Sequence, residues 1–503
     1  MLNKFLPAIK TTIFDHRVFF FLMAFYAFLS TFMLEKYPRV WVDEPWESIT
    51  ASTLAHEGKM YNLVLENYTG FDKVLLQPRL FLSMAVAPAF ALFGVGPVQG
   101  RLVSAACGAL LMIAVYLFTS KFFSKRAALF AVWFVMIETM MFISYRTIRP
   151  EIYLVTLESY SMLFLFQGIR ANSKAYFFWS GLFAGVALWT HPNAVLHVGA
   201  VAVLLLLTYK SGAFTSRYSW SFAAALLIAL LPYLIYVIAN DARNSFSTFY
   251  LQLDNRTSSL AQQNWLATSL RGEWNRIVEY AQFPYRAPIV LVFASVWVRS
   301  LVSKKIETRN VAIVVGMYIL LSILVISNKT VLYTTSVLPM LCILAAVNTD
   351  ELLGAPHAFG ERIRRIFHSG YFRESLGIGL FVLLSLNQLA GDARLLWHNR
   401  NCSYTETIKQ LQTVIPPDAR VWGSITFWFG FQHQPLRTQY THLREVDTFK
   451  PEYMITGDTE IWGKDFWKSV RDDADAVIKE RGTLVAEFPE NCYGTLRVYH
   501  LRW

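Results

Sequence analysis

The chain has 503 residues, of which 54% are hydrophobic and only 16% are charged, and its formal net charge is +11. A soluble protein carries about 25% charged residues, and a disordered chain has far fewer apolar ones. The composition therefore excludes an ordinary soluble protein and a disordered one. The apolar residues are grouped in segments of about 20, which is the length that crosses a ~30 Å hydrocarbon core. The sequence therefore predicts an α-helical polytopic membrane protein.

Most basic residues lie in short loops between apolar segments, which is how membrane topology is encoded, so we expect no nucleic-acid partner. No small-residue cleavage site follows the basic segment 1–17, which favours an uncleaved first span over a signal peptide. About eleven spans are predicted, at 18–34, 101–119, 127–145, 152–169, 176–190, 194–208, 220–239, 287–301, 311–327, 331–347 and 376–391.

Orientation follows from the loop charges. With a cytoplasmic N-terminus, most Lys and Arg of the short loops lie inside and the C-terminus lies outside. A further apolar stretch, 79–94, is short and contains Pro88. If this stretch crossed the membrane, every later loop would change sides and the charge bias would invert. We therefore expect it to lie on the membrane or to re-enter it.

This topology divides the chain into a transmembrane module, 1–392, and a soluble external tail, 393–503. Two long external loops, 35–100 and 240–286, belong to the transmembrane module. The tail has a helical pattern at 404–414 and strand-like runs at 419–423, 452–456, 483–488 and 495–501. This alternation is typical of a small α/β domain, and about 110 residues are enough to bury a core.

Charges that the topology does not require indicate where chemistry could occur. Asp43 and Glu44 lie between Trp41 and Trp46, just outside the first span. They could be solvated loop residues within a belt of interfacial tryptophans. Alternatively, a carboxylate at this depth could take a proton from an acceptor hydroxyl, because an unperturbed Asp has a pKa of about 3.9 and is ionised.

A second group of charges lies in the short outer loop 146–151, which contains Arg146, Arg149 and Glu151. They could form an internal ion pair at a helix boundary. Alternatively, the arginines could bind a phosphate, whose oxygens suit the planar guanidinium. Lys329, with Tyr333 close behind it, is an isolated external cation that could snorkel or meet the same phosphate.

The remaining candidates are weaker. His191 stands at another outer boundary, where a helix cap is the alternative to a catalyst, and no histidine or cysteine has metal-ligand spacing, so no metal is assigned. The acids Glu138 and Glu158 fall within spans and either hydrogen-bond between helices or line a polar groove. Because the external side of the membrane is an oxidising environment, the tail residues Cys402 and Cys492 are expected to form a disulfide rather than two buried thiols.

Taken in chain order, these features resemble the GT-C superfamily of polyprenyl-phosphate-dependent glycosyltransferases. The similarity is greatest to the protein O-mannosyltransferase and lipid A aminoarabinose transferase group, including its RgtA/B/C/D-like bacterial members. Its motifs are Asp-Glu at 43–44, Gln-Pro-Arg-Leu-Phe at 77–81, Leu-Phe-Gly at 92–94 and Arg-Leu-Val-Ser-Ala at 101–105. The resemblance covers roughly the first 350 residues.

The resemblance implies transfer of a sugar from a polyprenyl phosphate on the external face, usually with inversion at the anomeric carbon. It implies Asp43 as the general base with Glu44 as its partner, and Glu151 at a second acidic position that is usually Asp. It places near the donor phosphate the residues Arg101, Lys329 and Tyr333, beside Arg146 and Arg149. Arg79, His191 and Glu158 would line the site.

The acceptor, whether lipid, glycan or protein, stays open, because many members have Lys-Pro-Pro or His-Pro-Pro where this chain has Leu-Gln-Pro at 76–78. Two alternatives also stay open. A secondary transporter would favour inverted repeats, which we do not find, although the intramembrane acids allow it. A lipid-linked glycan ligase or polymerase would use a diphosphate donor. We expect an integral protein of a bacterial inner membrane, with the endoplasmic reticulum as the alternative.

Overall fold

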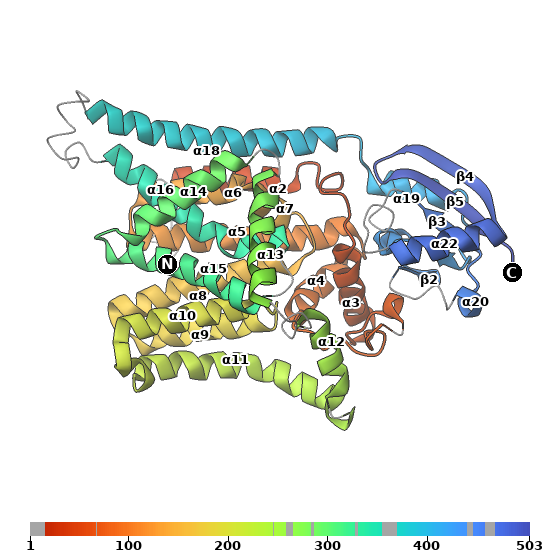
Figure 1. Cartoon of the computed structure of the whole chain (residues 1–503), viewed down its shortest axis with the longest axis horizontal. Coiled ribbons are helices and arrows are strands. Elements are labelled where there is room, and N and C mark those ends of the chain that lie inside the picture. The colour runs from red at the N-terminus through yellow and green to blue at the C-terminus, as the bar shows by residue number, and fades with distance from the viewer. Residues whose placement is uncertain are drawn as a thin grey trace, which may run out of the picture.

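The computed structural model describes residues 16–66, 68–244, 246–257, 265–282, 286–326, 330–354, 370–439, 446–457 and 468–503. A helical bundle occupies one end of the long axis and a small mixed domain the other (Figure 1). The bundle helices are α2 (Arg17–Thr31), α5 (Pro97–Phe122), α6 (Lys125–Ile137), α7 (Thr139–Ser144), α8 (Pro150–Ala171), α9 (Lys174–Leu188), α10 (Ala194–Tyr209), α11 (Arg217–Asp241), α14 (Ala287–Leu301), α15 (Ile306–Val325), α16 (Leu338–Gly354) and α18 (Gly370–His398).

Six of the described helices are long and apolar enough to cross a membrane by length and composition, and three shorter apolar helices accompany them. The prediction of a polytopic α-helical membrane protein is therefore confirmed. Each predicted span coincides with helical structure, whereas the number of eleven crossings stays a prediction.

Two predicted spans differ from the structure. The span 127–145 is broken at Glu138, whose extended backbone separates α6 from α7 and whose Oε2 accepts a hydrogen bond (2.8 Å) from the backbone N–H of Met141. Tyr280 donates to the other carboxylate oxygen (2.9 Å), and Arg286 forms an ion pair with it. The span 331–347 begins with a 3₁₀ helix, η5 (Val331–Ser336), and α16 starts only at Leu338, just before Pro339.

The stretch 79–94 forms α4 (Leu80–Phe93), a helix of 14 residues that contains Pro88. At 1.5 Å per residue it is about 21 Å long, which is too short for a ~30 Å hydrocarbon core. Together with α3 (Asp43–Glu57) and the 3₁₀ helix η1 (Leu63–Leu65), it lies between the bundle and the mixed domain (Figure 1). Its placement on the membrane or as a re-entrant segment stays a prediction.

The remaining loop helices are α12 (Ser247–Thr257) and α13 (Trp265–Gln282), with 3₁₀ turns η2 (Lys210–Phe214) and η3 (Ala242–Asn244) beside α11. Helix α12 covers the first loop through Gln252, whose Oε1 accepts from the backbone N–H of Leu76 (2.8 Å) and whose amide donates to Val74 O (2.9 Å). The two long loops of the transmembrane module are therefore folded against each other.

The tail forms a five-stranded sheet in the order β2-β1-β3-β5-β4. Strands β1 (Val421–Trp422), β2 (Leu436–Arg437) and β3 (Tyr453–Thr456) are parallel, whereas β5 (Gly494–Leu501) is antiparallel to β3 and to β4 (Gly482–Asn491). Its helices are α19 (Tyr404–Gln412), η6 (Ile425–Gly430), α20 (Val446–Phe449) and α22 (Lys468–Arg481). All four predicted strand segments contain strands, and the small α/β tail is confirmed.

Polar contacts fasten the tail to the first loop. Glu35 caps α19, because its Oε1 accepts from the Ser403 hydroxyl (2.9 Å) and from the backbone N–H of Thr405 (3.0 Å). The backbone N–H of Val40 donates to the Tyr493 hydroxyl (3.0 Å). A disulfide joins Cys402 to Cys492, with their Cα atoms 5.2 Å apart, and so connects the start of the tail with the β4–β5 hairpin.

Candidate active site

Asp43 begins helix α3, where Asp43 and Glu44 occupy the first turn. Two carboxylates are favourable there, because the unpaired N–H groups give a helix N-terminus a partial positive charge. Glu47 lies one turn further along, on the same face as Asp43. Successive residues of a helix point about 100° apart, so Glu44 leaves this face and enters the protein interior.

Arg149 connects Asp43 with Glu151. It immediately precedes α8, which starts with Pro150 and has Glu151 in its first turn. The guanidinium donates to both oxygens of Glu151 (2.7 and 3.1 Å), and its remaining terminal nitrogen forms an ion pair with Asp43. Burial lowers the pKa of Arg149, but the charges of Asp43 and Glu151 reverse this effect and hold the pKa well above its usual range.

A second ion pair, between Glu47 and Arg79, lies beside the first and is almost fully buried. Burial lowers the pKa of Arg79, whereas the charge of Glu47, followed by those of Asp43 and Glu151, raises it above its usual value. The predicted residues Arg79, Asp43 and Glu151 therefore belong to one electrostatic cluster. Glu47 was not predicted, although its position four residues after Asp43 is a usable signal.

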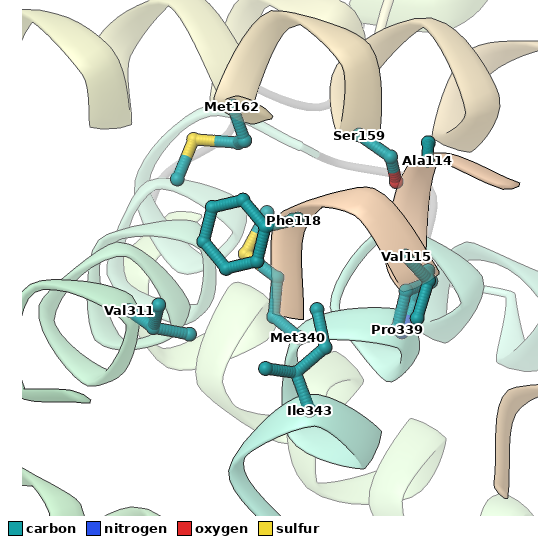
Figure 2. Close-up of a pocket in the computed structure, with 9 residues that line it drawn as sticks. All are labelled: Ala114, Val115, Phe118, Ser159, Met162, Val311, Pro339, Met340 and Ile343. Atoms are coloured by element: carbon teal, nitrogen blue, oxygen red, sulfur yellow. The ribbon is translucent and has the colours of Figure 1, made fainter. Parts of the chain in front are cut away.

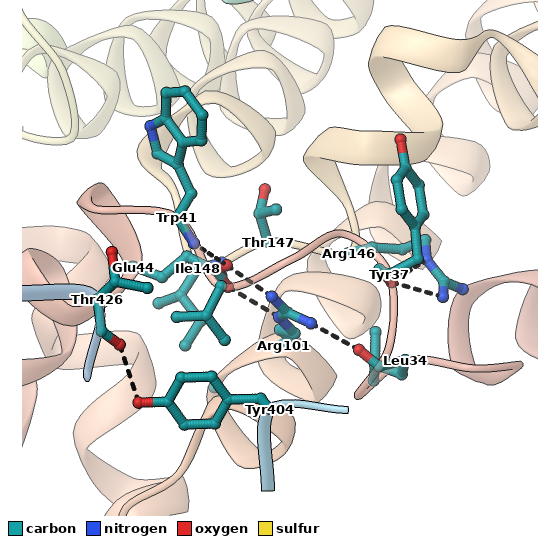
Figure 3. A network of polar contacts seen from close by, with 12 residues as sticks. Leu34, Tyr37, Trp41, Glu44, Arg101, Arg146, Thr147, Ile148, Tyr404 and Thr426 are labelled. Carbon is teal, nitrogen blue, oxygen red and sulfur yellow. Dashed lines mark hydrogen bonds and ion pairs between the residues drawn. The ribbon is translucent and has the colours of Figure 1, made fainter. Parts of the chain in front are cut away.

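Glu44 lies in the core with Arg101, and neither side chain has any exposed surface. Arg101 donates through Nε and Nη2 to the two Glu44 oxygens (2.8 and 2.7 Å) and through Nη1 to Leu34 O (2.6 Å). Glu44 also accepts from the backbone N–H groups of Trp41 (3.2 Å) and Ile148 (3.1 Å), as Figure 3 shows. Arg101 is therefore held in the protein interior, where its described hydrogen bonds go to the protein's own carboxylate and carbonyl groups.

Arg146 is also fully buried; it lies beside Tyr37 (Figure 3) and caps the end of α2. It donates to Tyr37 O (2.8 and 3.2 Å), to Phe32 O (2.7 Å) and to Leu29 O. A cation is favourable at a helix C-terminus, where carbonyl groups lack intrahelical partners. The described hydrogen bonds of Arg101 and Arg146 go to the protein's own carboxylate and carbonyl groups, and their contact with a donor phosphate stays a prediction.

A cavity of about 880 Å³ opens beside Asp43 and Arg149. Its apolar lining comes from the bundle and from η5, and includes Met140, Ile143, Val331, Leu332 and Leu395. Its polar lining comes from the first loop, from α13 and from the junction with the tail, and includes Arg39, Thr147, Glu279, His398, Asn399, Asn401 and Asn491. Neither Arg101 nor Arg146 is among the described residues of this lining. The cavity can therefore take a molecule with an apolar part and a polar part.

Tyr333 stands in η5, and the three residues before Tyr333 in the sequence, Thr330, Val331 and Leu332, line the cavity. The ring of His191 packs edge-on against it, with centroids 5.3 Å apart. His191 Nδ1 accepts from the backbone N–H of Asn193 (3.1 Å), so this side chain supports the turn before α10. Lys329 lies outside the described residues.

The intramembrane acids serve different helix contacts. Glu138 forms the interhelical ion pair with Arg286 described above, which fits the first of its two predicted roles. Glu158 is fully buried in α8 and is not among the described residues that line the cavity. Within the described ranges no group of three or more His, Cys, Asp or Glu side chains could hold a metal ion.

Two other cavities differ from this one. A cavity of about 20 Å³ among α5, α8, α15 and α16 is lined mostly by apolar side chains such as Phe118, Met162 and Ile343 (Figure 2), and it has room for about one water molecule. A cavity of about 740 Å³ lies between the C-terminal half of α3 and the tail, where His56 and His433 contribute to its lining. Neither lining includes Asp43 or Arg149 among the described residues.

Comparisons with known proteins agree with this architecture. Residues 80–236 match the family described as dolichyl-phosphate-mannose-protein mannosyltransferase. No curated protein matches the chain by sequence.

Among solved structures, the fold is similar to that of ArnT from Cupriavidus metallidurans bound to undecaprenyl phosphate, with a TM-score of 0.65 and 15% identity over 96% of this chain and 98% of that one. It is also similar to the oligosaccharyltransferase AglB from Archaeoglobus fulgidus in complex with an inhibitory peptide and a dolichol phosphate, with a TM-score of 0.52 and 12% identity over 96% and 74%. The resemblance stated from the sequence is therefore confirmed, and this chain has the fold of the GT-C glycosyltransferases.

Proposed function

We propose that this protein transfers a sugar from a polyprenyl-phosphate donor to an acceptor hydroxyl at the external membrane face, with inversion at the anomeric carbon. One observation carries the proposal: Asp43 and its partner Arg149 both line a cavity whose walls are apolar on the bundle side. A lipid-linked sugar has the matching two-part chemistry. The similarity to ArnT, which was solved with undecaprenyl phosphate, and the match to a mannosyltransferase family support the same reaction class.

The charges around Asp43 constrain how a donor phosphate could bind. Asp43, Glu47 and Glu151 supply three carboxylates, whereas Arg79 and Arg149 supply two guanidiniums. The net charge of this cluster is therefore −1, which opposes the binding of an anionic ligand. Binding becomes favourable if an arginine of the cluster exchanges a carboxylate partner for the ligand, or if a further cation joins the cluster. Lys329, which precedes η5 in the sequence, is our candidate for an added cation.

Arg149 is the arginine that can exchange a carboxylate partner for the donor phosphate. Glu151 holds its Nε and Nη2, whereas Asp43 holds only Nη1. In our proposal the donor phosphate takes the place of Asp43 at Nη1, while Glu151 keeps the guanidinium in position. Asp43 then loses this ion pair, so donor binding itself would make its carboxylate more available to the acceptor.

The reaction then balances as follows. Asp43 accepts the proton of the acceptor hydroxyl as its oxygen forms a bond to the anomeric carbon, and the bond between that carbon and the donor phosphate breaks with its electron pair passing to the phosphate oxygen. A general base contributes roughly 10²–10⁴ in rate. A preorganised hydrogen-bond donor that faces the developing negative charge contributes about 2.7–4 kcal/mol in oxyanion-binding sites. These are the contributions that we assign to Asp43 and Arg149.

The proposal assigns residues 1–392 to donor binding and chemistry, and residues 393–503 to covering the cavity from outside. The charge bias of the loops supports a cytoplasmic N-terminus and an external tail. We propose a bacterial inner membrane as the location.

The test is Asp43→Asn, which keeps the size and the polar contact but removes the base. We expect the variant to fold and insert normally and to lose at least a hundredfold in transfer from a synthetic radiolabelled polyprenyl-phosphate sugar. Glu57→Gln is the matched control, because Glu57 lies on the same helix but at its exposed end. Turnover near that of the wild type in Asp43→Asn would refute the assignment.

A further inference from the structure

The cavity beside Asp43 presents a second set of polar side chains. Glu279 enters it from α13, His398 and Asn399 from the end of α18, and Asn401 from the connection to the tail. The side chain of Trp41, two residues before Asp43, also contributes to the lining. Three segments that are far apart in the sequence thus direct polar groups into the space that Asp43 faces.

These side chains differ from the arginines of the protein interior in being available to a ligand. Glu279, His398 and Asn401 are exposed, and within the described part of the chain none of the three has a hydrogen bond or ion pair to protein. Asn399 donates its amide to Leu395 O (2.8 Å) and keeps its carbonyl oxygen for a ligand. Together they offer several hydrogen-bond donors and acceptors at the cavity wall.

The combination of groups identifies the chemical class of ligand. A hydroxyl both donates and accepts, and carboxylate, amide and imidazole groups can satisfy both functions. The flat indole of Trp41 adds an apolar face with a polar edge, which suits the C–H face of a sugar ring. The positive charge of Arg39, which donates one hydrogen bond to Cys492 O (2.6 Å), is balanced in this set by the negative charge of Glu279, so the set has no net charge and suits a neutral ligand.

We infer that these residues form a binding subsite for the carbohydrate part of the acceptor, so that the accepting hydroxyl belongs to a neutral glycan rather than to a peptide side chain or a phospholipid. This inference rests on the proposed function, since it assigns the acceptor to the cavity that holds Asp43. An apolar acceptor would leave the polar groups of the wall without partners, which costs binding free energy.

The disulfide holds part of this subsite in place. Cys402 directly follows Asn401, and both Cys402 and Cys492 line the same cavity. A fixed connection lowers the entropic cost of ordering the wall when a ligand binds. The external tail therefore acts as one side of the acceptor site as well as a cover.

The experiment uses the full-length protein in detergent and has two measurements. In the first, tetrasaccharides released from neutral envelope glycans are titrated without donor, and the fluorescence of Trp41 is followed against Trp41→Phe. In the second, the labelled donor is supplied with the tetrasaccharides, with a Ser/Thr peptide or with phospholipid vesicles in parallel. We compare wild type with Glu279→Gln, His398→Ala and Asn401→Ala. His433→Ala, which alters an exposed histidine of the other large cavity, is the matched control.

We expect label only in the tetrasaccharide fraction. Each substitution should raise the KM for this acceptor about tenfold, which corresponds to one lost hydrogen bond to a charged or polar group. The KM for the donor should stay within twofold of the wild-type value. Label in the peptide or the phospholipid, or an unchanged acceptor KM in all three variants, would overturn the subsite. If the proposed function failed instead, no acceptor would be labelled, whereas the fluorescence titration would still report whether the glycan binds at Trp41.

Discussion

The buried pair Glu44–Arg101 gives a prediction whose magnitude follows from the structure. Neither side chain is exposed, and Glu44 accepts four hydrogen bonds, two of them from Arg101. Glu44→Gln removes the negative charge and leaves the guanidinium buried without compensation. Breaking a buried ion pair from one side typically costs about 3–5 kcal/mol, so we expect the free energy of unfolding to fall by that amount.

Thermal unfolding in detergent measures this effect in a double-mutant cycle with Arg101→Gln and the double variant. The double variant contains no buried charge at this position, so we expect it to be more stable than either single variant. Asp43→Asn serves as the comparison, because its side chain is 32% exposed and its loss should change stability by less than about 1 kcal/mol. If Glu44→Gln kept the wild-type unfolding midpoint yet lost turnover, Glu44 would be catalytic and our structural assignment would be refuted.

Three further predictions concern the attachment of the tail. Cys402→Ser should lower the stability of the tail by about 4.6 kcal/mol in the chain-entropy account, because the disulfide closes a separation of 90 residues, and limited proteolysis with and without reductant checks this. Arg437→Ala removes a half-exposed ion pair to Glu66 and should change the unfolding midpoint little, since such pairs are worth about 0–1 kcal/mol; a large loss would contradict this.

The third of these predictions is a pH dependence. Burial raises the pKa of Glu35, but hydrogen bonds from Thr405 and Ser403 outweigh it, so the folded pKa is lower than usual. The contribution of Glu35 to stability is therefore complete above its usual pKa of about 4.3 and is lost as the pH falls through the lower folded value. Glu35→Gln should remove this part of the acid-side slope; an identical slope would exclude the capping role.

Much of the fold could be predicted because apolar segments of fixed length specify membrane helices. The break at Glu138 shows where this reasoning stops. Hydropathy treats 127–145 as one segment, whereas the charge of Arg286 and the hydroxyl of Tyr280 make it favourable to open the helix at the glutamate. Such partners come from a distant loop, and no local pattern announces them.

The site was predictable in part for a related reason. Sequence position indicated that Arg101, Arg146 and Arg149 all lie near one membrane boundary, but not what each guanidinium meets. Arg101 meets Glu44, Arg146 meets the end of α2, and Arg149 meets Asp43 beside the cavity. Charge alone cannot separate a structural cation from a ligand-binding one. Glu279 illustrates the converse, because an exposed glutamate on an amphipathic helix gives no sign that a cavity lies in front of it.

The two adjacent acids at the start of α3 show how one step along a helix separates a structural carboxylate from the proposed base. A rotation of about 100° per residue directs Glu44 into the core, where four hydrogen bonds fix it. The same rotation leaves Asp43 at the cavity wall, in an ion pair that is partly exposed. A proton acceptor must be able to exchange partners during a reaction, whereas a buried, fully bonded carboxylate cannot do so without breaking its pair. Because Glu44 anchors the backbone N–H groups of Trp41 and Ile148, it fixes the segments that carry Asp43 and Arg149, and the rigid acid thereby positions the exchangeable one.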